Sequence, residues 1–479
     1  MRFKPPTVLR KHAVRNMIVA GTVLVAVSGL TLPQFVPQAK ADPQFTLVAV
    51  GSDTIQDVWS GFTNGQPANA GAGLAAVPAP LAASEVGSYN ATNAATGNIN
   101  EIITPQDGFA VNNNIVPNPT AAHPLTPGTC SYARPNGSGQ GIAALRLANN
   151  ATSTLGLASI APGATPGLGC VDIARSSSGV DTNDNNPAVD LQWVPFAIDA
   201  VGPATGPSSC SPSTNCPSFS ADLGNGSVQS VNTVQSTLGS AIGQMTVSQI
   251  SQLYNCNPVP VTVGSTTTTY IGTVIGQSVP SGDVGVDLYV PQSGSGTRKF
   301  WEGSTAANFS DGTVDTATGC VHDYIVGGVL NNVTEGFKVP VEEHDGTAVS
   351  TDPIGYDPFS IAQYISQQNP THNPRVHGAV LLGVNVSGTV VAPFTGTGIS
   401  ALLNTNFPIL RYVYNVVKLS RLTTAGDPID SLFNGQGSAI CKAKPVIQEY
   451  GFALMGASVF QGLTCGEISS ASPDLEGAP

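Results

Sequence analysis

Four short stretches rich in Gly, Ser and Thr each follow an apolar run of strand length and precede a helix-like segment. In such a turn the backbone curls so that successive N–H groups point at one spot, and the following helix adds its unpaired first-turn donors and the positive end of its dipole. A single stretch of this composition is also typical of an ordinary tight turn, with a Ser or Thr that caps the following helix and no ligand. Their recurrence indicates an anion-binding site built from "GSDT" (51–54), "NGSG" (136–139), "ARSSSG" (174–179) and "SGSGT" (293–297).

The elements that must position these turns are predicted by the alternation of apolar runs with helix-like stretches. This alternation favours an α/β architecture with mostly parallel sheets, in which ligands bind at the carboxyl ends of the strands. Thr246 and Gln249 have the spacing of a capping box at the start of a helix over 245–256. We also expect strands over 45–50, 193–202 and 407–417, and a Gly turn leading into an amphipathic helix over 353–369.

The N-terminal residues have the pattern of a secretory signal peptide. A basic start leads into an apolar run from Met17 to Leu32, and the triplet Ala39-Lys40-Ala41 follows. The run has sixteen residues, whereas a membrane span needs about 20, so cleavage after Ala41 is favoured over a membrane anchor. We therefore expect a secreted protein that is extracellular or associated with the cell wall.

The mature chain is acidic and large. Residues 1–41 carry six of the 18 Lys and Arg and none of the 30 Asp and Glu, so the formal charge after cleavage is −18. Nucleic acid and anionic membranes require a basic surface, and the composition excludes both as partners. The chain that remains after residues 1–41 are removed is longer than the roughly 250 to 300 residues at which a single hydrophobic core stops growing. Its length therefore predicts two or three domains.

The eight cysteines predict structural disulfides, because they are even in number, lie in an exported chain and form no C-x-x-C pair. Spacing alone leaves the pairing open. We expect sequential pairs, of which the close pair Cys210–Cys216 is the most secure. The other expected pairs are Cys130–Cys170, Cys256–Cys320 and Cys441–Cys465.

The order of these motifs, closed by "EYGFALM" (449–455), resembles that of the periplasmic-type phosphate-binding proteins, the solute receptors of phosphate ABC importers. The "SGSGT" turn, "PIGY" (353–356) and "FPILRYVY" (407–414) carry most of the resemblance. It implies a two-lobed (Venus flytrap) α/β fold with mixed, mostly parallel sheets and a ligand cleft between the lobes. On this plan lobe one comprises residues 42–200 plus 375–479, with a surface insertion at 90–129, and lobe two comprises 201–374.

The resemblance also implies which residues bind the ligand. The contacts come from all four turns, mostly through backbone N–H groups and hydroxyls. The expected residues are Ser52, Asp53, Thr54, Ser138, Gly139, Ser176, Ser177, Ser295, Gly296 and Thr297.

Two positions depart from the family pattern. An Arg that pairs with phosphate normally stands four residues before the Ser of the S-G-T turn, and Pro291 stands there instead. The third turn normally carries an acidic residue that accepts a hydrogen bond from protonated phosphate, and Ser177 stands in its place. We expect Arg175, Arg134 or Arg298 to restore the positive charge.

Three further acidic features have alternative interpretations. Asp53 either caps the helix that follows it or supplies the missing carboxylate, and Asp199 is a candidate hydrogen-bond acceptor between the lobes. "EEHDGTAV" (342–349) is interpreted as a loop at the cleft rim rather than a catalytic or metal cluster. "DTNDNNPAVD" (181–190) lacks the Gly and the closing Glu of a calcium loop and is interpreted as a solvated loop.

The sequence therefore favours a secreted, monomeric solute-binding protein that binds an oxyanion, with phosphate as the favoured ligand. An ABC importer permease is a potential partner. We expect no enzyme activity and no cofactor, because the chain has no G-x-S-x-G nucleophile motif. The alternatives are a secreted phosphatase or esterase on the same scaffold, and a surface protein that has kept the fold and lost the ligand.

Overall fold

The computed structural model describes the chain between residues 47 and 468, and the predicted signal peptide lies outside the described residues. The same holds for nearly all of the insertion at 90–129, for the loop 181–190, and for Cys130, Cys210 and Cys216. Within the described part, no helix has the length and apolar character needed to cross a membrane. The stretches left out between 47 and 468 are 66–75, 82–85, 90, 92–134, 150–168, 180–190, 207–219, 223–227, 231–241, 275–276, 308–313, 315–318, 327–339, 353, 370–371, 373–374 and 457–461.

The largest sheet has 11 strands and is mixed. Pairing is parallel at β2-β1-β3 and along β11-β9-β8, and antiparallel around the long strands β4 and β17 and between β7 and β8. In path order the strands are β2 (Val86–Ser88), β1 (Leu47–Gly51), β3 (Ile173–Ser176), β17 (Leu410–Lys418), β4 (Leu191–Thr205), β11 (Gly355–Ser360), β9 (Val284–Tyr289), β8 (Thr266–Gly272) and β7 (Val259–Val263), with β10 (Val321–His322) on β9 and β12 (Val380–Leu381) on β4.

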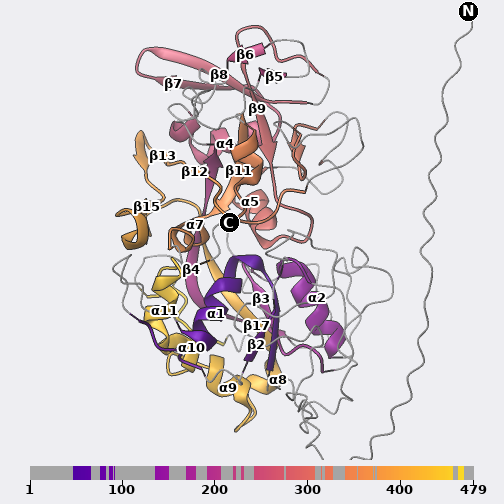
Figure 1. Ribbon diagram of the computed structural model, residues 1–479, viewed down its shortest axis with the longest axis vertical. Coiled ribbons are helices and arrows are strands. Elements are labelled where there is room, and N and C mark those ends of the chain that lie inside the picture. The colour runs from indigo at the N-terminus through magenta and orange to yellow at the C-terminus, as the bar shows by residue number, and fades with distance from the viewer. Residues whose placement is uncertain are drawn as a thin grey trace, which may run out of the picture. The chain divides into compact units, whose positions relative to one another are not determined.

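Strand β4 divides this sheet into two halves. Its residues 191–200 pair with β17, whereas residues 201–205 pair with β11. We call the part with β1–β3 and β17 the first half, and the part with β7–β12 the second half. Figure 1 shows β4 passing from one group of elements to the other. The predicted two-part α/β architecture with mixed sheets is therefore confirmed.

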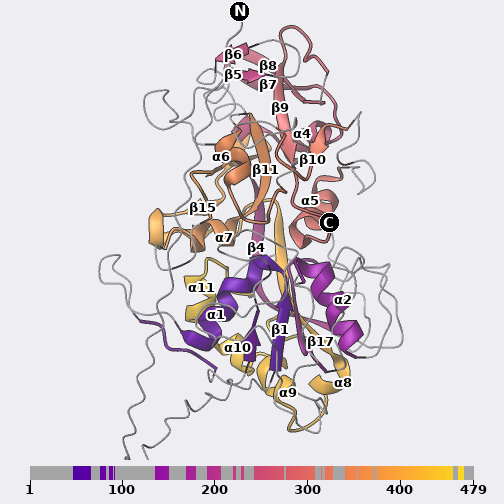
Figure 2. The ribbon, with the colours of Figure 1, turned by 45° about the vertical axis from the view of Figure 1, so that its right-hand side comes forward.

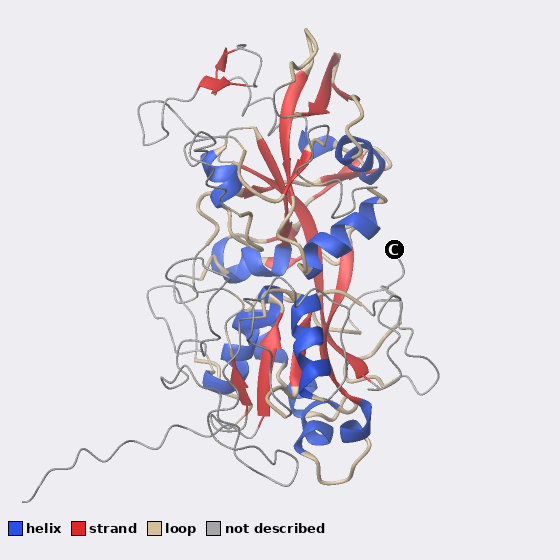
Figure 3. Ribbon diagram, turned by 90° about the vertical axis from the view of Figure 1, so that its right-hand side faces the viewer, coloured by secondary structure: helices blue, strands red, loops and turns tan. Residues whose placement is uncertain are grey.

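Helices cover both faces of the first half because the side chains of β1 alternate in direction. Leu47 and Ala49 belong to the core that contains Trp59 of α1 (Gln56–Asn64), whereas Val48 and Val50 belong to a separate core with Ile142 of α2 (Ser138–Ala148). Helices lie on either side of the strands in Figure 3. Both faces of β1 are thus packed in a core, and its carboxyl end leads into the first Gly/Ser turn.

The remaining elements surround the two halves (Figure 2). Around the first half lie α8 (Leu419–Leu422), α9 (Pro428–Phe433), α10 (Ala439–Lys442) and α11 (Lys444–Glu449), and around the second lie α4 (Val247–Tyr254), α5 (Gly296–Thr305), α6 (Thr347–Thr351) and α7 (Ile361–Ser366). The short elements are the 3₁₀ helices η1 (Asp53–Ile55), η4 (Ile242–Gln244) and η6 (Gly398–Ser400), and the two-stranded pairs β5 (Ser220–Asp222) with β6 (Val228–Ser230), β13 (Val384–Val386) with β14 (Thr389–Val391), and β15 (Phe394–Thr395) with β16 (Leu402–Leu403).

Several local predictions are confirmed. Thr246 and Gln249 form both hydrogen bonds of a capping box at the start of α4. Two of the expected disulfides are present, Cys256–Cys320 and Cys441–Cys465. Cys170 is also disulfide-bonded, but its expected partner lies outside the described residues.

The prediction of a Gly turn leading into a helix over 353–369 is wrong in its first part. Residues 355–360 form β11, and only 361–366 are helical in α7. All six β11 residues are buried, as in a strand covered on both faces. The sequence did not indicate this strand because Asp357 and Pro358 are of residue types that are depleted in central strands.

Candidate anion-binding site

The four predicted turns lie together where the two halves meet. The first and third turns follow the parallel neighbours β1 and β3, whose register sets Gly51 opposite Arg175. The second turn begins α2, and its Asn136 forms a β-bridge with Gly51. The fourth turn begins α5 in the second half, and Gly294 O accepts a 3.3 Å hydrogen bond from the Gly139 N–H. Hydrogen-bond donors from both halves therefore lie close together at the carboxyl ends of β1 and β3.

Hydroxyl groups from the first three turns are linked to one another. Ser52 Oγ donates to Ser177 Oγ over 3.0 Å, and the Ser177 N–H donates to Ser138 Oγ over 2.9 Å. The Ser138 and Ser177 hydroxyl oxygens are 3.3 Å apart. All three serines are buried. These side chains are donors and acceptors that an oxyanion could engage in place of one another.

The fourth turn packs directly on these hydroxyls through Gly296. A Cβ atom at this position would lie 2.2 Å from Ser138 Oγ and 2.4 Å from Ser177 Oγ. Only glycine leaves room for this approach, because real Cβ contacts are longer. The following helix α5 begins with Ser295 as its N-cap, whose Oγ accepts from the Arg298 N–H. The first turn of α5 therefore packs directly against Ser138 and Ser177 of the first half.

The positive charge at the site comes from Arg411 of β17. Its Nη2 donates to Thr54 Oγ1 at 3.3 Å and to Thr297 Oγ1 at 3.0 Å, and its Nη1 donates to Ser177 O at 3.1 Å. The side chain is buried. The guanidinium thus touches the first, third and fourth turns. Arg411 is not among the predicted contacts; its only signal in the sequence is that it is a lone Arg inside the apolar strand segment 407–417.

Asp199 of β4 holds this guanidinium in place. Asp199 Oδ2 accepts from Arg411 Nε at 2.9 Å and from Nη2 at 2.8 Å. Its Oδ1 accepts from Ser360 Oγ and from the Ala362 N–H, both in the second half. Asp199 therefore acts as the hydrogen-bond acceptor predicted for it, and it positions Arg411 from the neighbouring strand.

Two of the arginines expected to supply the charge have other partners in the structure, and the third, Arg134, lies outside the described residues. Arg175 donates to Ser88 Oγ, Gly51 O and Tyr89 O, so it holds the first turn against β2. Arg298 donates to Pro291 O and forms an ion pair with Asp323 at 3.0 Å. Arg175 thus supports the turns from behind, and Arg298 lies beside the start of α5.

The remaining predicted contacts are placed as follows. Ser176 Oγ donates to Ser178 O within the third turn, and Gly139 lies in the first turn of α2. Asp53 makes no capping bond at η1 or α1, so the capping interpretation is wrong. Its Oδ1 instead accepts from Arg375 Nη2 at 3.0 Å.

The cluster "EEHD" (342–345) was expected at a cleft rim and lies deeper, with Glu343 and His344 fully buried. Glu343 Oε1 accepts from Ser295 Oγ and, at 3.1 Å, from the Thr297 N–H. Burial, followed by the charge of Asp53, raises the pKa of Glu343. The same causes raise the pKa of Glu342 to about 8. The sequence alone gave no sign that this loop contacts the fourth turn.

His344 completes the contacts around Thr54. Its Nδ1 accepts from the Ser360 N–H at 3.3 Å, so the ring proton lies on Nε2, which is 2.8 Å from Thr54 Oγ1. Burial lowers the pKa of His344, so the ring is neutral. Atoms of Asp53, Glu343 and His344 lie within 4.8 Å of one another. In this tautomer both ring nitrogens are engaged, so the ring offers no lone pair to a metal ion.

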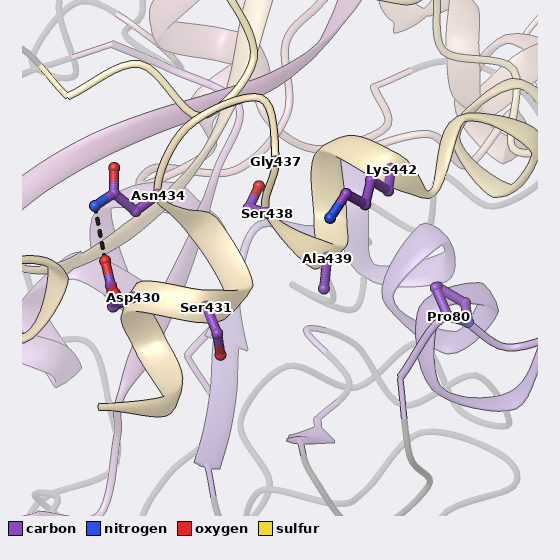
Figure 4. A pocket seen from close by; sticks show the side chains of 8 residues that line it. All are labelled: Pro80, Asp430, Ser431, Asn434, Gly437, Ser438, Ala439 and Lys442. Carbon is purple, nitrogen blue, oxygen red and sulfur yellow. Dashed lines mark hydrogen bonds between the residues drawn. The ribbon is translucent and has the colours of Figure 1, made fainter. Parts of the chain in front are cut away.

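A separate pocket of about 680 Å³ lies at α9 and α10 (Figure 4). Several of its polar side chains are used locally: Asn434 donates to Asp430, Ser431 donates to Pro428 O, and Ser438 caps α10. The charged members of its lining are Asp430 and Lys442. The lining residues are Pro80, Asp430, Ser431, Asn434, Gly437, Ser438, Ala439 and Lys442.

Comparison with known proteins gives only remote structural likeness. No protein-family model and no curated protein matches the chain. Among solved structures, it is similar to a putative phosphate ABC transporter substrate-binding protein with bound phosphate from Clostridium perfringens, with 14% identity, 60% of this chain and 80% of that chain covered, and a TM-score of 0.29.

Two further structures show the same level of likeness. PstS from Borrelia burgdorferi is 11% identical over 86% of this chain and 99% of that chain, with a TM-score of 0.30. A phosphate binding protein from Stenotrophomonas maltophilia is 12% identical over 70% of this chain and 86% of that chain, with a TM-score of 0.30.

Proposed function

We propose that the chain is an exported solute-binding protein that captures a small oxyanion, phosphate in the first instance, between its two halves. One observation carries the proposal: the buried Arg411 guanidinium contacts Thr54 and Thr297, which come from different halves. The contacts of an oxyanion would replace the present bonds among these groups and the serines. The proposed ligand contacts are Thr54, Ser138, Ser177, Gly296, Thr297 and Arg411.

The chemistry of these groups suits an oxyanion. A tetrahedral anion has several acceptor oxygens, and charge-assisted hydrogen bonds from hydroxyls, a helix N-terminus and a guanidinium are the strongest available to it. Because the donors come from both halves, an anion that touches all of them stabilises the state in which the halves are together. This supports capture by closure, without a covalent step.

The lobes of such a receptor are proposed from the strand pairing. The change of partner along β4, from β17 to β11, supports a first crossing near residue 200. Residues 380–381 pair with the second-half end of β4, and Asn385 N donates to Met245 O. We therefore assign 201–403 to lobe two, which moves the second crossing from the predicted 375 to just before β17.

Thermal unfolding of residues 42–479 tests the proposal. The protein is measured alone and with phosphate, sulfate, a sugar phosphate and a carboxylate. A specific ligand at 100 times its Kd stabilises the folded state by about 2.7 kcal/mol. A rise with phosphate alone supports a phosphate receptor, and a rise with another anion keeps the site and changes the ligand. No rise with any anion refutes the proposal and favours a surface protein without a ligand.

A matched pair of variants tests the site. Thr297→Ala removes a hydroxyl that contacts Arg411, and we expect it to weaken anion binding by about 1–3 kcal/mol. Thr305→Ala is the control, because Thr305 lies in the same helix and its hydroxyl donates to Trp301 O. Equal affinities in the two variants would remove α5 from the site. Turnover of a chromogenic phosphate ester, lost in Thr297→Ala, would instead indicate a hydrolase.

A further inference from the structure

Helix α5 already carries an anion at its N-terminus, and that anion belongs to the protein. Glu343 Oε1 accepts from Ser295 Oγ and from the Thr297 N–H. These two donors belong to the "SGSGT" turn, the one whose pattern most strongly predicts oxyanion binding. A carboxylate oxygen thus occupies a position that an oxygen of an external anion would need.

The second oxygen of the same carboxylate has no partner. Glu343 is fully buried, and among the described residues nothing donates to its Oε2. The nearest ring nitrogen, His344 Nε2, lies 3.7 Å away. Leaving a buried carboxylate oxygen without a donor is costly. Glu343 therefore contacts the turn even though one of its two oxygens has no hydrogen-bond donor in the described part of the chain.

The backbone beside Glu343 is also held in an uncommon conformation. His344 has φ of 58°, in the left-handed region that non-glycine residues seldom adopt. Its ring contacts fix this loop to Thr54 and to the Ser360 N–H. Such outliers persist where surrounding contacts enforce them, and they cluster at ligand sites.

We propose that Glu343 is a built-in competitor of the external ligand: its carboxylate occupies the α5 turn, and an oxyanion binds there only by displacing it. This inference rests on the proposed function. As a consequence, the turns alone would bind the anion more tightly than the whole protein does, because part of the binding free energy is used to displace the Glu343 carboxylate. Glu343 then sets how high the anion concentration must be before the protein responds.

Calorimetric titration of residues 42–479 with inorganic phosphate and, separately, sulfate tests this role. The variants are Glu343→Gln, which keeps an acceptor oxygen for the turn but loses the charge, and Glu343→Ala, which vacates the position. Glu302→Gln is the control, since it removes a carboxylate from the same helix α5, away from its N-terminus. We expect both Glu343 variants to bind the anion at least tenfold more tightly than the wild type, and the control to match the wild type.

The outcomes separate this inference from the proposed function. Tighter binding in both Glu343 variants, including binding where the wild type shows none, supports the competitor role. Unchanged or weaker binding in both, with a wild type that binds, overturns the competitor role, makes Glu343 a ligand contact or a bystander, and leaves the proposed function standing. No binding by any of the proteins overturns the proposed function and this inference with it. Circular dichroism of each variant verifies that the fold is retained.

Discussion

Replacing Arg411 with Met should cost more stability than the same change at Arg298, whose carboxylate partner is partly exposed. Arg411 and Asp199 form an ion pair whose side chains are 2% and 0% exposed. The substitution keeps an apolar stem but removes both donors to Asp199 Oδ2. The carboxylate then stays in place, because its Oδ1 is still held by Ser360 and Ala362.

The magnitude follows from the burial of the partner. Breaking a buried pair by removing one member leaves an uncompensated buried charge and costs about 3–5 kcal/mol. Adding Asp199→Asn to Arg411→Met removes that charge, so the double variant should lose less than the sum of the single variants. We expect a coupling energy of about 2 kcal/mol.

Urea denaturation of residues 42–479 measures the free energies of unfolding for the four members of this cycle. Arg298→Met is the matched control, because its partner Asp323 is 29% exposed; solvent screens such a pair, and we expect a cost of about 1 kcal/mol. If Arg411→Met costs no more than Arg298→Met, or if the single effects simply add, the Arg411–Asp199 pair does not organise the site as described.

Three other perturbations have clear expected outcomes. Gly296→Ala should abolish anion-induced stabilisation in thermal unfolding, because its Cβ would lie 2.2 Å from a serine oxygen, whereas Gly303→Ala, with no atom within 4 Å, should bind normally and gain about 0.4–1 kcal/mol. Burial raises the pKa of Glu342 to about 8, so the folded state binds an extra proton above the unfolded pKa of 4.5, and stability measured in urea should fall as pH rises towards 8, with a smaller fall in Glu342→Gln. Replacing Cys256 and Cys320 by Ser opens a loop of 64 residues and should cost about 4 kcal/mol in the same assay; a cost below about 1 kcal/mol would contradict the entropic estimate.

The turns could be predicted from the sequence because their chemistry is local. "SGSGT" needs only its own residues to form a curled backbone and a helix start, and Ser295 does cap α5. The same locality explains the capping box at Thr246 and the strand around Asp199. Local order thus indicated which segments form the turns, and the sheet rule predicted that they lie at strand ends.

The charged residues of the site could not be predicted in the same way. Arg411 reaches the turns because β17 pairs with both β3 and β4, a pairing that spans more than 200 residues and leaves no local pattern. Glu343 approaches Thr297 across a loop whose composition is typical of a solvated surface. Arg175 and Arg298 looked more promising because they adjoin the turns, yet adjacency in sequence does not fix the direction of a side chain.

The position of β17 between β3 and β4 has a consequence for the order of folding. Residues 201–403 form a contiguous segment with its own strands and helices, so the second half can assemble without residues of the first half. The first half lacks its middle strand until residues 410–418 are available, and until then β3 and β4 present unpaired edges to each other. Refolding should therefore be biphasic, with the second half forming before the first. A chain truncated before residue 410 would stop after the first phase, with its edges open to aggregation and no Arg411 to complete the site.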